Sequence, residues 1–158
     1  MLVIYYRRFQ VLPVITKNRY AHPVAPADIV RISTRESPAH RGRLRFSVDF
    51  IVPQGTRVLA AADGRVVDVK ADSKKGGDDK KFEKDGNFIE IYHRNFEYSE
   101  YEHLSKVVVK PGEQVSTGQL IGYSGATGWL GGLGPHLHFM VGVYEDYHTL
   151  RIRWLRRH

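Results

Sequence analysis

Two histidines one residue apart carry the strongest chemical signal in the sequence. They are His136 and His138, in the stretch GPHLHF. Side chains at positions i and i+2 of a β-strand lie on the same face, about 6.6 Å apart at a rise of about 3.3 Å per residue. The spacing predicts two imidazoles projecting from a rigid strand, so that one binds a metal ion and its neighbour reaches a water on that ion. Two surface histidines on a strand are the alternative interpretation.

A further histidine and a carboxylate, far away in the chain, are candidates for the same site. His103, in the motif YEHLS, ends a run of β-type alternation that places it on the face of Tyr101. Asp49 ends the polar face of residues 44–50. Taken alone, His103 is more often a structural histidine, and Asp49 more often caps a turn. Combined with the histidine pair, they form a mixed imidazole and carboxylate set that suits zinc.

The amino-acid composition excludes several kinds of site and partner. The chain has 158 residues, which fits one domain, and no cysteine, which excludes disulfides, Cys-ligated zinc and cysteine-based catalysis. Lysine and arginine exceed the acidic residues by 24 to 17, giving a net charge of +7 that attracts anionic polymers. No nucleic-acid-binding motif accompanies this charge, so we expect no nucleic acid partner. We expect no transmembrane segment, and the first residues do not follow the pattern of a signal peptide.

The elements that must position these residues are short strands. Glycine and proline recur at short intervals, and period-2 alternation dominates between them. We therefore expect a mainly β fold: a compact antiparallel sheet or sandwich of short strands with a groove and little helix. Residues 1–38 are predicted to be an extension that wraps the core, and residues 39–158 to be the functional domain with a basic C-terminal strand or tail. Strands are predicted at 44–50, 57–61, 64–70, 87–93, 96–103 and 137–144, and a long mobile loop at 74–86.

Four stretches in register carry a resemblance to a known family. They are DFIVPQGTRVLAAADGRVV at 49–67, YEHLS at 101–105, VKPGEQVSTGQLIGYSGATG at 109–128 and GPHLHF at 134–139. Each resembles, in order, a motif of the lysostaphin-like (LytM-type) zinc endopeptidases. The match runs from about residue 40 to residue 143, about two-thirds of the chain.

The resemblance implies roles for four residues. Asp49 and His138 match metal ligands, and His103 and His136 match the two histidines that stay off the metal and assist catalysis. It also implies one Zn²⁺ ion, and hydrolysis of peptide bonds in the stems or cross-bridges of bacterial peptidoglycan. The expected location is outside the cytoplasm, in the periplasm, the cell wall or the medium. Anionic cell-wall polymers are a second expected partner.

The sequence departs from the family at one ligand position. The usual histidine four residues before the aspartate is replaced by Arg45, whose guanidinium stays protonated and does not ligate zinc. His40, nine residues before Asp49, is favoured as the third ligand, with His22 or no third ligand as alternatives. Arg45 is expected to line the groove, where it positions a substrate carboxylate or pairs with Asp49.

The loop at 125–134 has five glycines in ten residues and leads into the histidine pair. Glycine permits close backbone approach, which suits a groove wall that binds an extended peptide. Thr127 and Trp129 in this loop are predicted to contact substrate. A flexible turn, with Trp129 as its hydrophobic anchor, is the alternative.

Three other functions compete with the enzyme. A catalytically degenerate family member that binds the cell wall or activates another hydrolase is favoured by Arg45. A biotinyl- or lipoyl-type carrier hairpin at 109–125 shares the Val-x-x-Gly-x-x-Val pattern but leaves the histidine pair unexplained. Nucleic-acid binding rests on charge alone.

Overall fold

The computed structural model describes residues 14–143 and 148–156. Among these residues, short strands dominate and the helices are 3-10 helices of three to six residues, which confirms the expected mainly β class. None of the described helices has the length and apolar character that crossing a membrane requires. The strands are β1 (Arg31–Ser33), β2 (Val48–Ile51), β3 (Arg57–Leu59), β4 (Gly64–Lys70), β5 (Gly76–Gly77), β6 (Phe88–Tyr92), β7 (Glu97–Glu102), β8 (Leu104–Val107), β9 (Gln114–Val115), β10 (Leu120–Ser124), β11 (Gly128–Trp129) and β12 (Leu137–Val143). The 3-10 helices are η1 (Pro26–Asp28), η2 (Gly42–Leu44), η3 (Lys80–Asp85) and η4 (Arg94–Phe96).

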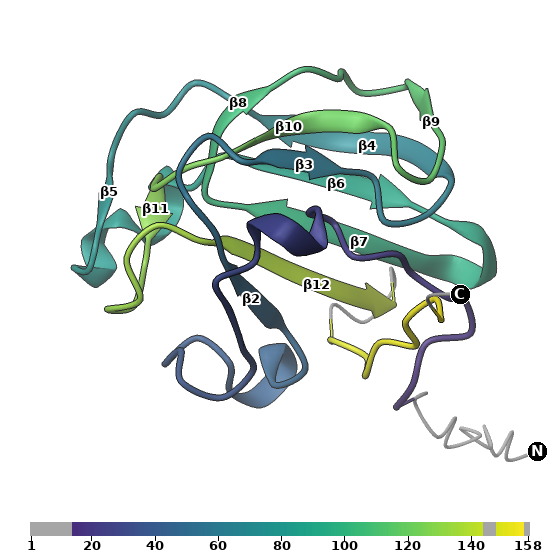
Figure 1. Ribbon diagram of the computed structural model, residues 1–158, viewed down its shortest axis with the longest axis horizontal. Coiled ribbons are helices and arrows are strands. Elements are labelled where there is room, and N and C mark those ends of the chain that lie inside the picture. Colours follow the sequence, from purple (N-terminus) through teal and green to yellow (C-terminus); the bar gives the residue numbers. More distant parts are fainter. Residues whose placement is uncertain (1–13, 144–147, 157–158) are drawn as a thin grey trace, which may run out of the picture.

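The strands form one large sheet and two small ones (Figure 1). The large sheet has seven antiparallel strands in the order β1-β2-β12-β7-β6-β4-β9. The second sheet, β3-β10-β8, lies beside the β4 and β6 end of the first (Figure 1). The third is a parallel pair of β5 and β11, beyond one end of the strands.

One face of the large sheet is apolar, and the other carries the candidate site residues. In β6, Ile89 and Ile91 are fully buried and alternate with Glu90, as the period-2 pattern requires. Tyr101 in β7 and Phe139 in β12 extend this buried face, and they lie opposite each other in register. Burying these four large side chains stabilises the fold by about 1.5–3 kcal/mol each. The residues between them must then lie on the other face.

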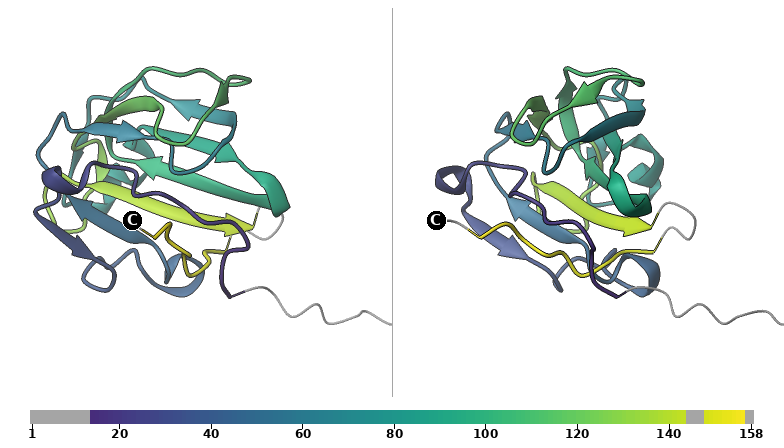
Figure 2. Two further views of the ribbon diagram at one scale, coloured as in Figure 1. Left: turned by 45° about the vertical axis from the view of Figure 1, so that its right-hand side comes forward. Right: turned by 90° about the vertical axis from the view of Figure 1, so that its right-hand side faces the viewer.

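The two ends of the described chain run together along this sheet (Figure 2). Backbone hydrogen bonds join Thr16 to Arg151 and Tyr20 to Arg153. Tyr20 is fully buried, and its hydroxyl donates to Glu97, whose carboxylate also accepts from the backbone of residues 17 and 18. The Glu97 carboxylate therefore links the first described segment to the start of β7 by hydrogen bonds. The predicted boundary at residue 38 stays a prediction.

Two local predictions were wrong. The strand predicted at 44–50 begins at Val48, because residues 42–44 form η2, which begins at Gly42 with a φ of 55°. The segment 74–86 is folded rather than a plain loop: it contains β5 and η3, and β5 pairs with β11. Its glycines make that pairing possible, since a Cβ on Gly76 would meet the carbonyl oxygen of Ala126 at 1.9 Å.

Candidate active site

Cross-strand register brings the predicted aspartate and histidine together. Asp49 in β2 lies directly opposite His138 in β12, on the face of the sheet that faces away from Phe50 and Phe139. The Asp49 Oδ1 atom is 2.8 Å from Nδ1 of His138. Both side chains are buried although they are polar. Such burial is costly unless each group is paired, so the two depend on each other.

His40 completes this group from outside the sheet. Its Nε2 atom lies 3.2 Å from Asp49 Oδ1 and 3.3 Å from His138 Nδ1. A turn in which the His40 amide donates to the Ser37 carbonyl carries the ring to this position. These three residues have the geometry of a group that can hold a metal ion. We call His40, Asp49 and His138 the metal triad.

An unsatisfied atom within the metal triad favours an occupant. Oδ2 of Asp49 is buried and has no hydrogen-bond partner among the described residues. A buried acceptor without a donor costs about 1–3 kcal/mol, and more when it is charged. A cation between the three side chains would offset this cost.

The electrostatics keep the carboxylate anionic. Burial raises the pKa of Asp49, but hydrogen bonds with His138 and His40 outweigh it and hold the pKa well below its ordinary value. For His138, burial lowers the pKa and the hydrogen bond with Asp49 raises it, with a net rise. The Asp49 carboxylate is therefore anionic at neutral pH.

His103 and His136 face the metal triad with one ring nitrogen each. Nδ1 of His103 is 2.7 Å from the Thr127 carbonyl, and Nδ1 of His136 is 2.7 Å from the Gly134 carbonyl. A carbonyl only accepts, so both rings carry their proton at Nδ1 and leave Nε2 as a free acceptor. Nε2 of His136 is 3.6 Å from Asp49 Oδ1. The ring centroids of His103 and His136 are 4.6 Å apart.

Burial also sets the protonation of these two histidines. It lowers the pKa of His103 to about 4, and it lowers the pKa of His136 below the ordinary value. Both imidazoles are therefore neutral at neutral pH. Neutral imidazoles with an exposed lone pair can take a proton from water, which is what a general base requires.

The position of His103 depends on an unusual backbone conformation. It follows the end of β7 with a φ of 64°, in the left-handed region that most side chains avoid. The predicted alternation with Tyr101 was therefore wrong, because this backbone turns the ring away from the apolar face. The glycine at 128 allows the loop to approach, since a Cβ there would lie 2.7 Å from the Gly86 backbone and 3.3 Å from Nδ1 of His103.

Thr127 has a different environment from the predicted substrate contact. Its hydroxyl donates to the Leu104 carbonyl and accepts from the Asn87 amide, while its own carbonyl holds His103. Through these bonds, Thr127 holds the His103 ring in position. Its side chain is buried.

Trp129 does lie at the site. Together with the catalytic candidates it lines a cavity of about 130 Å³. Its indole Nε1 donates to the Asp78 carbonyl at 3.0 Å, which fastens the ring to the segment predicted to be a loop. Glu83, from η3 in that segment, lines the same cavity. No sequence signal connects η3 to the histidines, because the contact depends on β5 pairing with β11.

Glu102 is a site residue that sequence reasoning missed. It lies opposite His138 in register and lines the cavity with His103. Burial raises its pKa, but interaction with Glu100 and with the nearby histidines lowers it on balance. Strict alternation in β7 places residue 102 on the face opposite to Tyr101, so the signal was present in the motif YEHLS.

Arg45, predicted to line the groove, and His22, the alternative third ligand, both lie away from the metal triad. Arg45 follows η2, and its guanidinium carbon lies 4.6 Å from the Phe46 ring centroid. The predicted pairing with Asp49 was wrong, since the ion pairs of Asp49 in the described chain are all with histidines. His22 packs edge-on against Phe50 and Trp154, at 5.5 and 4.9 Å between ring centroids.

Known proteins share this arrangement of motifs. Residues 43–149 match the sequence pattern of Peptidase family M23. The chain is 38% identical over 137 residues to the peptidoglycan DD-endopeptidase ShyA of Vibrio cholerae, covering 87% of this chain and 28% of ShyA. It is 39% identical over 108 residues to lysostaphin of Staphylococcus simulans, covering 66% of this chain and 20% of lysostaphin. The chain thus spans less than a third of the length of these two relatives.

Solved structures agree with the sequence matches. The crystal structure of a zinc-containing peptidase from Vibrio cholerae aligns with a TM-score of 0.61 and 31% identity, covering 84% of this chain and 39% of that one. The catalytic domain of lysostaphin from Staphylococcus simulans aligns with a TM-score of 0.51 and 36% identity, covering 63% and 67%. The matching motifs, the β architecture and the extent of the alignment lead to one conclusion: the chain belongs to Peptidase family M23.

Proposed function

We propose that this protein is a zinc-dependent endopeptidase that hydrolyses peptide bonds of bacterial peptidoglycan, in stem or cross-bridge peptides. One observation carries the proposal: His40, Asp49 and His138 place three ligand atoms 2.8–3.3 Å apart, next to two neutral histidines. Metal ligation and proton transfer are then available in one buried corner of the sheet.

The metal triad fits zinc. Ligand atoms at about 2.0–2.1 Å from a tetrahedral ion lie about 3.3–3.4 Å from each other, close to the spacing of the three atoms here. One carboxylate and two imidazoles leave a fourth position open, as in catalytic sites. Bound zinc supplies a Lewis acid and lowers the pKa of water from 15.7 to about 7.

His103 and His136 do the proton chemistry in this proposal. One of the two accepts a proton from the attacking water at Nε2, because Nδ1 of each ring is already protonated and bound to a carbonyl. The water oxygen bonds to the carbonyl carbon, the carbon–nitrogen bond breaks, and the proton passes from Nε2 to the leaving amine. Acid–base assistance of this kind contributes about 10²–10⁴-fold.

The relatives support the substrate and the location in this proposal. ShyA is a peptidoglycan endopeptidase by name, and the net charge of +7 suits an anionic cell envelope. We therefore place the protein outside the cytoplasm. Trp129, at the rim of the cavity, is the side chain we assign to substrate contact; Thr127 positions His103.

The test is hydrolysis of purified sacculi, followed by turbidity and by analysis of released peptides. We expect clearing that EDTA abolishes and added zinc restores. His103→Ala should keep zinc stoichiometry near one and lose activity by about 10²–10⁴-fold. Clearing that continues in EDTA would overturn the metal mechanism. Zinc-loaded protein that binds sacculi and releases no peptide would support the degenerate alternative instead.

A further inference from the structure

A second cavity, of about 490 Å³, lies beside the start of β2, away from the metal triad. Val48, Ile152 and Trp154 form its apolar wall, and Trp154 packs against Phe50 with ring centroids 6.0 Å apart. Successive side chains of a strand point to opposite faces, so Val48 and Asp49 face opposite ways. The cavity therefore belongs to the other side of β2 and has no part in the proposed hydrolysis.

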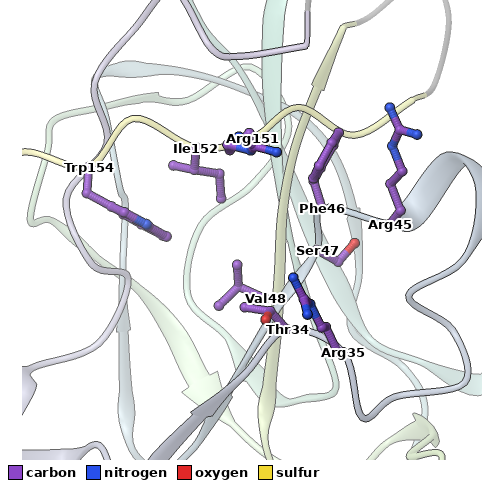
Figure 3. A pocket seen from close by; sticks show the side chains of 9 residues that line it. All are labelled: Thr34, Arg35, Arg45, Phe46, Ser47, Val48, Arg151, Ile152 and Trp154. Atoms are coloured by element: carbon purple, nitrogen blue, oxygen red, sulfur yellow. The ribbon is translucent and has the colours of Figure 1, made fainter.

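Three arginines surround this cavity. Arg35, Arg45 and Arg151 all line it, and Figure 3 shows Arg45 and Arg151 on the two sides of the Phe46 ring. Their guanidinium carbons lie 4.6 and 5.4 Å from the centroid of that ring. Such stacking holds a guanidinium in place while leaving its N–H groups available.

These arginines have no carboxylate partner in the described part of the chain, whereas the nearby Arg31 pairs with Glu36. Three like charges around one cavity repel each other, and an anion would remove the repulsion. A guanidinium is also the side chain best suited to bidentate contact with phosphate or carboxylate.

We propose that this cavity binds an amphipathic anion: a phosphate or carboxylate held by the arginines, attached to an apolar group that packs on Val48, Ile152 and Trp154. The volume falls in the range of about 300–1,000 Å³ that is usual for small-molecule sites. It exceeds what a bare phosphate or carboxylate fills. We call it the arginine cavity.

Binding can be measured through Trp154. The chain has two tryptophans, so Trp129→Phe leaves Trp154 as the only one. Hexyl phosphate, hexanoate and inorganic phosphate are titrated into this protein, with and without zinc, while indole fluorescence is recorded. We expect a saturable change with hexyl phosphate or hexanoate, equal in both metal states, and at least tenfold weaker binding of inorganic phosphate. The stronger of the two hexyl probes identifies the anionic group.

Charge-matched variants test the residues. Arg35→Gln with Arg151→Gln should weaken binding at least tenfold. The control is Arg57→Gln with Arg65→Gln, which removes the same charge from exposed positions in β3 and β4 and should change binding less than twofold. Equal loss in both pairs would show general charge attraction and overturn the proposal. So would the absence of saturation, or inorganic phosphate binding as tightly as hexyl phosphate. Neither result affects the hydrolysis experiment, because metal-free protein serves equally well here.

Discussion

His40→Ala is the sharpest test of the metal triad, because the sequence left this ligand open. In the structure, Nε2 of His40 contacts both Asp49 Oδ1 and His138 Nδ1, at 3.2 and 3.3 Å. The substitution removes one of the three proposed ligands and leaves Asp49 with one close histidine partner fewer. We expect the protein to fold and to bind zinc weakly.

The magnitude follows from the number of ligands. A structural zinc site with four protein ligands contributes about 10–16 kcal/mol, or about 2.5–4 kcal/mol per ligand. Loss of one ligand should therefore weaken zinc binding by about 10²–10³-fold. Part of this cost is recovered where water takes the vacant place, so the lower figure is the expected one.

Competition with a chromophoric chelator measures the affinity, and metal analysis after dialysis measures the stoichiometry. His22→Ala is the matched control, because it removes the other upstream histidine, which packs on Phe50 and Trp154. The control should keep wild-type zinc affinity. If His40→Ala keeps it as well, His40 is no ligand and the proposed triad is wrong. Loss of affinity in His22→Ala alone would transfer the role.

The other predictions concern the support of the site and the stability of the fold. Gly128→Ala should lower kcat by about 10²-fold with zinc retained, because its Cβ meets backbone 2.7 Å away beside His103, whereas Gly132→Ala, where nothing lies within 4 Å, should not; steady-state kinetics distinguish them. Glu97→Ala should lower the free energy of unfolding in urea by about 1–3 kcal/mol, since it leaves the buried Tyr20 hydroxyl without its acceptor; equal stability would contradict the fastening of the first segment. Burial lowers the pKa of His93 below 6.5, so protonation opposes folding, and stability should fall as the pH drops below 6.5. His93→Gln should reduce that slope but not abolish it, because burial also lowers the pKa of His103 and His136; an unchanged slope would assign the effect to those groups alone.

Local patterns in the sequence determined much of the sheet. Residues 64–70 were predicted as a strand and form β4, and residues 137–143 form β12 within the predicted 137–144. Alternation is a local property of two successive side chains, so it can be recognised without knowledge of the partner strand. The family was recognised for a similar reason, because each of its motifs is contiguous.

Prediction failed where contacts between distant segments decide the structure. Residues 44–47 alternate like a strand but are not part of β2, which begins at Val48, since η2 precedes it. The charged segment 74–86 has little to bury, yet it folds because β5 meets β11 and η3 reaches the site cavity. The turn of His103 away from Tyr101 depends on a single positive φ. None of these features has a signature within a short window of sequence.

The sequence by itself determined which side chains can do the chemistry: an aspartate, a histidine pair and a third histidine in motif order. It also indicated that Arg45 cannot serve as a ligand. Only the tertiary structure decided which upstream histidine joins Asp49, that Glu102 lies opposite His138, and that Arg45 borders the arginine cavity. The physical reason is that the type of a side chain is a property of one residue, whereas the distance between side chains is set by strand register and by the packing of distant segments. His40 and His138, for example, are 98 residues apart in the chain.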